Sequence, residues 1–326
     1  MKTFLVVNPR SANGQTGRRW AELSAEISKA VPDFGHAFTE RPMHGAELAR
    51  KALHQGYQCV VAVGGDGTVN EVINGFFENG QAINPQAALG VIPRGTGGDF
   101  RRTFEWDLEM ASAVDRLRGE TTAPFDVGVV EYLSAAGQPE TRYFANIASF
   151  GVSGMVVKKV NESSKVLGGR LSFMWGSVKA LAAYKDVKVR ISLDEGPMEE
   201  VPVTCLAVAN GRYFGGGMMV APQANTSDGL FDVTLWSGYG VSDFMFKQKA
   251  IFTGAHATWD RTRLFRAKTV RAECDSEVLM DVDGEQPGRL PCSMRILPSA
   301  IRLKTSATAP QAQGSMEQAA KVRSHG

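Results

Sequence analysis

The chain lacks most of the features that would place it in a familiar class at once. Its four cysteines form no CxxC pair and its five histidines show no HExxH-like spacing, so we expect buried free thiols in a reducing compartment and no histidine metal site. No apolar run approaches the roughly 20 residues that a membrane-spanning helix needs, and Asn8 ends the first apolar run too early for a signal peptide. A net charge of only +2 gives no electrostatic reason to expect nucleic-acid binding. We therefore expect a cytoplasmic protein.

The motifs of several common nucleotide-binding enzymes are also missing. The sequence contains no GxxxxGK loop followed by Ser or Thr and no protein-kinase catalytic or metal motif. Gly65–Asn70 begins like the dinucleotide fingerprint but lacks its last glycine, which disfavours a Rossmann dehydrogenase. What remains is an ordinary globular composition, 43% apolar and 21% charged, over 326 residues, a length sufficient for two domains.

The most informative stretch follows the strand-like residues Cys59–Val63, which are short, β-branched and apolar, as in a buried parallel strand. Three glycines around Asp66 come next. Thr68 with Glu71 has the spacing of a capping box, which predicts that a helix begins there. A strand, a glycine turn and a helix N-terminus leave backbone N–H groups pointing at an anion. A tight turn alone would explain the glycines, but together with Asp66 and the capping box they favour a phosphate site.

The first 125 residues repeat a strand–loop–helix unit, which predicts an α/β fold with a doubly wound, Rossmann-like parallel sheet. The strands are expected at residues 3–7, 36–39, 59–63 and 88–93, and the helices at 20–31, 46–54 and 69–77. Loops that follow parallel strands meet at one edge of the sheet. Thr39, residues 65–71 and Thr96 would all lie along that edge, and their convergence supports a nucleotide site better than any single glycine.

From about Phe125 the pattern changes. Residues 186–193 alternate strictly between apolar and polar side chains, which is typical of an antiparallel strand with one face exposed to solvent. Further strands are expected at residues 143–150, 203–209, 230–236, 278–282 and 294–303. One helix is expected from an apolar stripe that is more often core than a lipid groove: Leu171, Met174, Trp175, Val178, Leu181 and Ala182. The predicted organisation is an α/β domain (1–125), a β-sandwich domain (126–304) and a disordered tail (305–326).

Stretches spread nearly end to end resemble one known family. They are Val7–Pro9, Gly64–Val72, Ile92–Thr96, Phe125–Gly128, Asn146–Gly151, Asn210–Gly217, Ala221–Pro222, Ser227–Asp232 and Asp281–Glu285. GGDGT alone is shared with NAD kinases and phosphofructokinases, but GGDGTxNE followed by a PxGT loop and a late DGE is strongly specific. The chain resembles the diacylglycerol-kinase catalytic-domain family, which includes sphingosine, ceramide and bacterial lipid kinases. The resemblance implies a nucleotide-binding α/β domain joined to a β-sandwich, an active site in the cleft, and ATP-dependent phosphorylation of a lipid hydroxyl on diacylglycerol or a sphingoid base.

Phosphoryl transfer to an alcohol needs a phosphate cradle, a divalent cation and a positioned base. The expected ATP contacts are Gly65, Asp66, Gly67, Thr68, Val69, Asn70, Glu71 and Thr96, and the resemblance adds Thr39. Asp66 is the expected partner of the Mg²⁺ that accompanies ATP. One position departs from the family, because Gly98 stands where the family usually has asparagine. The loss of that amide puts nucleotide affinity or loop rigidity in question.

The resemblance implies that Asp283 takes the proton from the lipid hydroxyl and that Glu285 orients the site. From the residues alone Asp-Gly at this place indicates a hairpin turn, and Asp283→Asn is therefore expected to spare the fold. The resemblance also implies a second, structural Mg²⁺, held by the Asp228 carboxylate and by the carbonyl groups of Asn225 and Leu230. Oxygen-only ligands suit magnesium.

A lipid substrate implies transient contact with a membrane surface. The candidate contacts are Phe244, Met245, Phe246, Ile251 and Phe252, with basic Arg261, Arg263, Arg266 and Lys268 nearby. An NAD kinase is the nearest alternative enzyme, but Asn70–Glu71 and the Asp283–Glu285 triplet favour a lipid. A nucleotide-binding regulator without turnover is the other alternative; Gly98 is its only support, and Asp66 and Asp283 argue against it. The oligomeric state stays open, a homodimer included.

Overall fold

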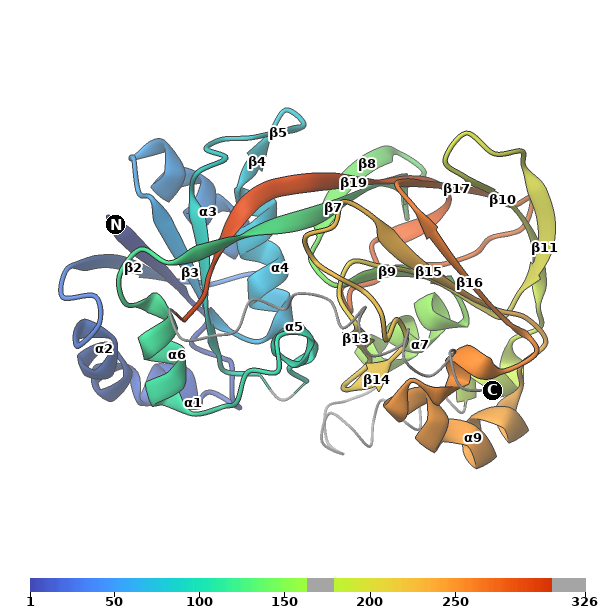
Figure 1. Ribbon diagram of the computed structural model, residues 1–326, viewed down its shortest axis with the longest axis horizontal. Coiled ribbons are helices and arrows are strands. Elements are labelled where there is room, and N and C mark those ends of the chain that lie inside the picture. Colours follow the sequence, from blue (N-terminus) through green and yellow to red (C-terminus); the bar gives the residue numbers. More distant parts are fainter. Residues whose placement is uncertain (96, 163–178, 307–326) are drawn as a thin grey trace, which may run out of the picture.

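Two domains lie end to end in the computed structural model, which describes residues 1–95, 97–162 and 179–306. Two long strands, β7 (Thr122–Ser134) and β19 (Gly288–Lys304), run from one domain into the other (Figure 1). One domain is α/β and the other is mostly β. The fold class predicted from the sequence is confirmed.

The α/β domain is built on a parallel sheet with the spatial order β6–β3–β1–β2. Its strands are β1 (Thr3–Val7), β2 (Phe34–Phe38), β3 (Cys59–Gly64) and β6 (Ala88–Pro93), with a small hairpin, β4 (Phe77–Glu78) and β5 (Gln81–Ala82). Its helices are α1 (Gln15–Arg18), α2 (Trp20–Ser28), α3 (His44–His54), α4 (Asp66–Gly75), α5 (Asp99–Thr103) and α6 (Met110–Leu117). Helices α3 and α4 pack on one face of the sheet and α2 and α6 on the other, which is why the strands are apolar throughout. The chain changes direction between β1 and β3, so the crevice opens beyond the carboxyl ends of these strands.

The second domain is a sandwich of two sheets around one apolar core. One sheet has the order β16–β15–β12–β9–β18, and the other contains β11–β10–β17–β19 with β7 and β8. The strands not yet given are β8 (Pro139–Phe144), β9 (Ile147–Gly151), β10 (Val187–Leu193), β11 (Glu199–Val203), β12 (Cys205–Ala209), β13 (Tyr213–Phe214), β14 (Met218–Met219), β15 (Phe231–Trp236), β16 (Thr262–Ala267), β17 (Thr269–Glu273) and β18 (Met280–Val282).

A single ten-stranded sheet joins the two domains. Strand β19 pairs antiparallel with β7 and then parallel with β6, where Arg302 faces Ala88. The predicted boundary at residue 125 therefore falls inside β7. The end of the second predicted domain, at Arg302 and Leu303, pairs with strand β6 of the first domain. Because these two strands are hydrogen-bonded along both domains, we expect the cleft between the domains to keep its shape.

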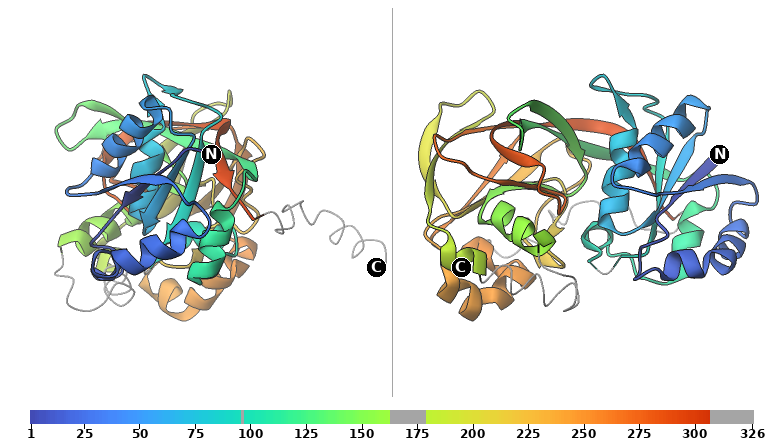
Figure 2. Two further views of the ribbon diagram at one scale, coloured as in Figure 1. Left: turned by 90° about the vertical axis from the view of Figure 1, so that its left-hand side faces the viewer. Right: turned by 180° about the vertical axis from the view of Figure 1, so that it is seen from behind.

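Helices α7 (Val152–Glu162) and α9 (Val241–Thr253) cover the outer face of the five-stranded sheet, and the sequence analysis predicted neither of them. They lie beneath the sandwich in both views and share an apolar cluster (Figure 2). The short helix η2 (Ala255–Thr258) follows α9. Leu171, Met174, Trp175 and Val178 of the predicted helix lie outside the described residues, as does the tail after Ser306. Among the described residues no helix is long and apolar enough to cross a membrane.

Candidate active site

A cleft of about 420 Å³ lies between the two domains. The α/β domain contributes the turn after β3 and the start of α5, and the sandwich contributes β13, α7 and the turn after β18. The acidic and basic residues that line it within the described chain are Asp66, Asp99, Arg102, Asp281, Asp283 and Glu285. Five of these carry a carboxyl group and one a guanidinium group, so an anion such as a triphosphate would need a cation to enter this cleft.

Two glycine turns form the floor of the cleft on the side of the α/β domain. A Cβ on Gly95 would lie only 2.6 Å from the Cα of Gly65, so the close approach of the two turns requires glycine. Asp66 and Gly67 open helix α4, where backbone N–H groups have no intrahelical acceptor. Asn8, after β1, donates to the Thr68 hydroxyl at 3.1 Å and fixes this turn to the neighbouring strand. The floor therefore presents N–H donors and a helix N-terminus to an anion.

The Asp66 carboxylate connects the two turns. Its Oδ2 accepts the N–H of Gly98 (2.9 Å) and of Asp99 (3.2 Å), and its Oδ1 accepts the N–H of Phe100 (3.1 Å). These are the first N–H groups of α5, so Asp66 acts as the cap of a helix that follows it by more than thirty residues. Asp66 therefore holds the second glycine loop against the first.

Gly98 has a left-handed backbone with a φ of +68°. Glycine adopts this conformation without strain, and asparagine is among the few other residues that visit it routinely. The departure from the family at Gly98 thus keeps the backbone that an asparagine would also permit. The amide group that an asparagine would supply at this position is still missing.

Asp283 is held by four hydrogen bonds. Its Oδ2 accepts Asn70 Nδ2 (2.9 Å) and the N–H of Ala145 (2.8 Å), and its Oδ1 accepts the N–H of Asn146 (3.0 Å) and Ile147 (2.9 Å). Two carboxylate oxygens offer about four lone-pair directions, and all are used. Burial raises the pKa of Asp283, while these donors lower it.

This bonding corrects two expectations from the sequence. The single strand predicted at residues 143–150 is wrong, because β8 ends at Phe144 and β9 begins at Ile147, where the backbone turns its N–H groups to Asp283. Asparagine at position 283 would place an NH₂ group against two N–H donors. Asp283→Asn is therefore expected to disturb the fold as well as the chemistry.

Two further carboxyl groups at the cleft are buried. Burial, followed by the nearby Asp66 charge, raises the pKa of Asp99 to about 6. Asp99 Oδ2 accepts the N–H of Gly216 at 2.8 Å, but its buried Oδ1 has no hydrogen-bond partner in the described chain. Burial raises the pKa of Asp281 to about 8. The sequence analysis assigned neither residue a role, although Asp281 lies inside one of the stretches that resemble the family.

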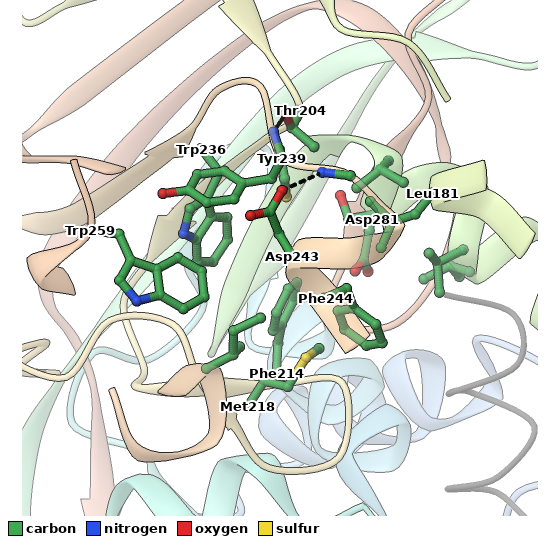
Figure 3. A pocket seen from close by; sticks show the side chains of 17 residues that line it. Leu181, Thr204, Phe214, Met218, Trp236, Tyr239, Asp243, Phe244, Trp259 and Asp281 are labelled. Atoms are coloured by element: carbon green, nitrogen blue, oxygen red, sulfur yellow. Dashed lines mark hydrogen bonds between the residues drawn. The ribbon is translucent and has the colours of Figure 1, made fainter. Parts of the chain in front are cut away.

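A second, apolar pocket adjoins the cleft beneath the sandwich (Figure 3). Helices α7 and α9 and the five-stranded sheet enclose it. Apolar side chains dominate its lining, among them Val156, Leu181, Phe214, Met218, Trp236, Phe244 and Trp259. Val157, Phe214 and Asp281 line both spaces, so the pocket and the cleft meet at a common wall.

The other residues predicted to bind the nucleotide have different positions. Val69 is buried in the core. Glu71 accepts the N–H of Met43 (2.9 Å) and of Gly45 (2.8 Å), which makes it the cap of α3. The predicted capping box is therefore wrong, because α4 begins at Asp66 and Glu71 does not bond its own helix start. Thr39 follows β2 at the expected edge but is not among the residues that line the cleft, and Thr96 lies outside the described residues.

The predicted structural Mg²⁺ site lies on the loop before β15. Asp228 Oδ1 accepts the N–H of Leu230 at 3.1 Å, and its Oδ2 is paired with the Arg266 guanidinium. Asn225 Oδ1 accepts the N–H of Ser227 at 3.2 Å. In the described residues no group of three His, Cys, Asp or Glu side chains is arranged to hold a metal ion. Because Arg266 already supplies positive charge to Asp228, this metal site stays a prediction that the geometry does not favour.

Comparisons with known proteins agree with this architecture. Residues 2–130 match the model of the diacylglycerol kinase catalytic domain, and residues 146–305 match the YegS C-terminal NAD kinase beta sandwich-like domain. The YtlR protein of Bacillus subtilis (strain 168) is 27% identical over 312 residues, which cover 93% of this chain and 99% of that protein. A diacylglycerol kinase of Staphylococcus haemolyticus (strain JCSC1435) is 26% identical over 302 residues, which cover 92% of this chain and 87% of that protein.

A solved structure shows the same fold. A diacylglycerol kinase from Bacillus anthracis str. Sterne superposes with a TM-score of 0.69 at 21% identity, covering 95% of this chain and 98% of that chain. The two domain models together span nearly all of the sequence, and both domains are present in the structure. The chain belongs to the diacylglycerol kinase catalytic-domain family.

Proposed function

We propose that this chain is an ATP-dependent lipid kinase that transfers the γ-phosphate of ATP to the hydroxyl group of a diacylglycerol or sphingoid-type lipid. The observation that carries the proposal is the wall shared by an acidic, glycine-floored cleft and an apolar pocket. The cleft suits a metal-bound triphosphate, and the pocket suits an aliphatic chain. A nicotinamide nucleotide has no comparable apolar part, so the pocket disfavours the NAD kinase alternative.

The donor set of the cleft fits Mg²⁺ together with ATP. Mg²⁺ usually binds one or two carboxylates and completes its shell with water and substrate phosphates. Asp99, with a buried oxygen that has no partner in the described chain, and Asp66, beside the phosphate floor, would hold it. The metal would neutralise charge on the phosphates. The N–H groups at the start of α4 would orient them.

Asp283 is our candidate for the base that receives the hydroxyl proton, with one condition. A proton can bind its carboxylate only if one of the four present donors moves away. Asn70 is the single side-chain donor among them, and a side chain rotates more easily than three backbone amides. Glu285 lines the same cleft and is our candidate for orienting the base or the metal.

Helix α9 supports contact with a membrane surface. Of the apolar residues predicted to touch the membrane, Phe244 and Ile251 line the apolar pocket instead, whereas Met245 is 51% and Phe246 88% exposed. The predicted basic partners are largely engaged, because Arg261 pairs with Asp243 and Arg266 with Asp228. The membrane contact we propose is therefore the outward face of α9, next to the pocket that would receive the lipid.

Replacing both exposed residues, Met245→Ser with Phe246→Ser, should weaken binding to phospholipid vesicles by at least about tenfold, because burial of one such side chain contributes about 1.5–3 kcal/mol. Co-sedimentation with vesicles of phosphatidylglycerol and phosphatidylcholine measures the change. Leu108→Ser is the matched control, since Leu108 is 57% exposed on the other domain. Equal losses in the two proteins would show that α9 is not the contact.

Transfer of radioactive phosphate from [γ-³²P]ATP to lipids tests the proposed activity directly. The purified chain is incubated with Mg²⁺ and with diacylglycerol, sphingosine, ceramide or monoacylglycerol in mixed micelles, and soluble NAD is the comparison substrate. Labelled lipid is the expected result. Labelled NADP with no labelled lipid would reject the proposal in favour of an NAD kinase.

A further inference from the structure

Asp281 is an acid with an unusual position in strand β18. Its neighbours Met280 and Val282 point into the sandwich core, so the alternation of the strand turns Asp281 to the opposite face, toward α7. The residue is only 5% exposed and lines both the apolar pocket and the polar cleft. Figure 3 shows its carboxyl group among the side chains of the apolar pocket.

The Asp281 carboxyl group is only partly used by the protein. Oδ1 accepts the N–H of Gly284 at 2.8 Å, and within the described residues this is its one hydrogen bond. Asp243, the other acid of the apolar pocket, differs because it is bonded to the N–H of Gly240 and paired with Lys247 and Arg261. Asp281 has no basic partner of that kind in the described chain. Asp281 is thus a 5%-exposed residue whose second carboxyl oxygen has no hydrogen-bond partner among the described residues, on the wall shared by the pocket and the cleft, and this indicates a missing ligand.

The surroundings of Asp281 favour its protonated form. Burial is the largest cause that raises the pKa of Asp281, and the negative charges of Asp283, Glu285 and Asp99 add to it. With the pKa of Asp281 raised to about 8, the carboxyl group is largely neutral at pH 7. Since Oδ1 accepts the Gly284 N–H, the proton belongs on Oδ2, which makes Oδ2 a hydrogen-bond donor to the space between pocket and cleft.

We propose that Asp281 binds an oxygen of an uncharged lipid headgroup and thereby holds the acceptor hydroxyl in the polar cleft while the acyl chain fills the apolar pocket. This inference rests on the proposed lipid kinase activity and narrows its substrate to a neutral lipid such as a diacylglycerol. A cationic sphingoid base would instead require an ionised partner at this position. Asp281 is therefore a specificity-determining residue that contacts the substrate, and it does not act as the base that accepts the hydroxyl proton.

The test compares Asp281→Ala and Asp281→Asn with the parent protein, using 1,2-dioctanoylglycerol and sphingosine in mixed micelles. Asparagine can keep both bonds, because its oxygen accepts the Gly284 N–H and its NH₂ group donates in place of Oδ2. We expect Asp281→Ala to lower kcat/KM for dioctanoylglycerol by about tenfold, the size of one net hydrogen bond, with the KM for ATP unchanged. Asp281→Asn should stay within about threefold of the parent. Equal activity of Asp281→Ala and the parent on dioctanoylglycerol would overturn the inference. So would a parent protein that prefers sphingosine to dioctanoylglycerol.

The dependence on pH gives a readout that a purely structural role would not move. A raised pKa means that Asp281 is protonated below about pH 8 and loses its donor above it. In the parent the kcat/KM for dioctanoylglycerol should therefore fall as pH rises through 8, and in Asp281→Asn that fall should be absent. Identical profiles in the two proteins would contradict the assignment.

A measurement of lipid binding in the absence of ATP distinguishes a failure of this inference from a failure of the proposed activity. Trp236 and Trp259 line the apolar pocket, so dioctanoylglycerol should change tryptophan fluorescence in the absence of ATP. If the parent phosphorylates lipids and Asp281→Ala binds dioctanoylglycerol as the parent does, the inference alone fails. If the parent neither phosphorylates nor binds any lipid of the panel, both fail together.

Discussion

An Asp283→Asn variant should lose about 10²–10⁴-fold in turnover, the usual contribution of a positioned general base. It should also melt at a lower temperature, because the new NH₂ group would face two N–H donors whichever way the amide is turned. ATP affinity should change much less, since Asp283 lies on the wall that the second domain contributes. Steady-state kinetics on a lipid, thermal unfolding and calorimetric ATP binding on the same preparations measure these effects.

Asp126→Asn is the matched control for the structural part of that loss. Asp126 is buried, its Oδ2 accepts the N–H of Gly229 at 2.7 Å and its Oδ1 that of Ser299 at 2.6 Å, and it is not among the residues that line the cleft. It should lower the melting temperature while leaving turnover of the folded protein near that of the parent. Near-normal turnover in Asp283→Asn would show that Asp283 is only a structural residue of the turn.

A Glu285→Gln variant should lose less turnover than Asp283→Asn if Glu285 only orients the site.

An Asp66→Ala variant should bind ATP at least about tenfold more weakly and lose turnover with it. Asp66 accepts three backbone N–H groups of the second glycine loop, and hydrogen bonds to charged groups contribute about 1.5–3 kcal/mol each. Without them the start of α5 is no longer held against the first glycine turn. Calorimetry with and without Mg²⁺ distinguishes two roles. A loss that appears under both conditions indicates loop positioning, and one that appears only with Mg²⁺ indicates a metal contact.

Asp194→Ala controls for the general loss of a carboxylate that bonds backbone amides. Asp194 Oδ1 accepts the N–H of Lys268 (2.7 Å) and of Thr269 (2.9 Å) in the sandwich domain, and Asp194 is not among the residues that line the cleft. This variant should be less stable but bind ATP as the parent does. Unchanged ATP affinity in Asp66→Ala would mean that Asp66 serves only the turn.

The sequence was informative where the signal is local. Five consecutive apolar residues at Cys59–Val63 and the glycines beside Asp66 predict a buried parallel strand and its turn, because burial on both faces and close backbone approach select these residue types. The alternation in residues 186–193 likewise predicts an antiparallel strand. These signals were enough for the fold class and for the general position of the cleft.

Sequence spacing gave the wrong prediction where a side chain could cap either its own helix or a distant one. Thr68 and Glu71 have capping-box spacing, yet Glu71 caps α3, which precedes it by almost thirty residues, and Asp66 caps α5, which follows it. A helix start is satisfied by whichever carboxylate the fold brings near it. Sequence spacing cannot show this, because the partner is chosen by packing.

The different surroundings of Asp281 and Asp283 are decided only by the tertiary structure. In the sequence the two aspartates are equivalent members of one Asp-Val-Asp-Gly stretch, and the resemblance directs attention to Asp283 alone. Four donors from α4 and from the break between β8 and β9 converge on Asp283. Within the described residues Asp281 accepts one hydrogen bond, and it lies between an apolar pocket and three other acids. A carboxyl group's protonation and free lone pairs depend on what surrounds it, and residues as distant as Asn70 and Asp99 supply those surroundings.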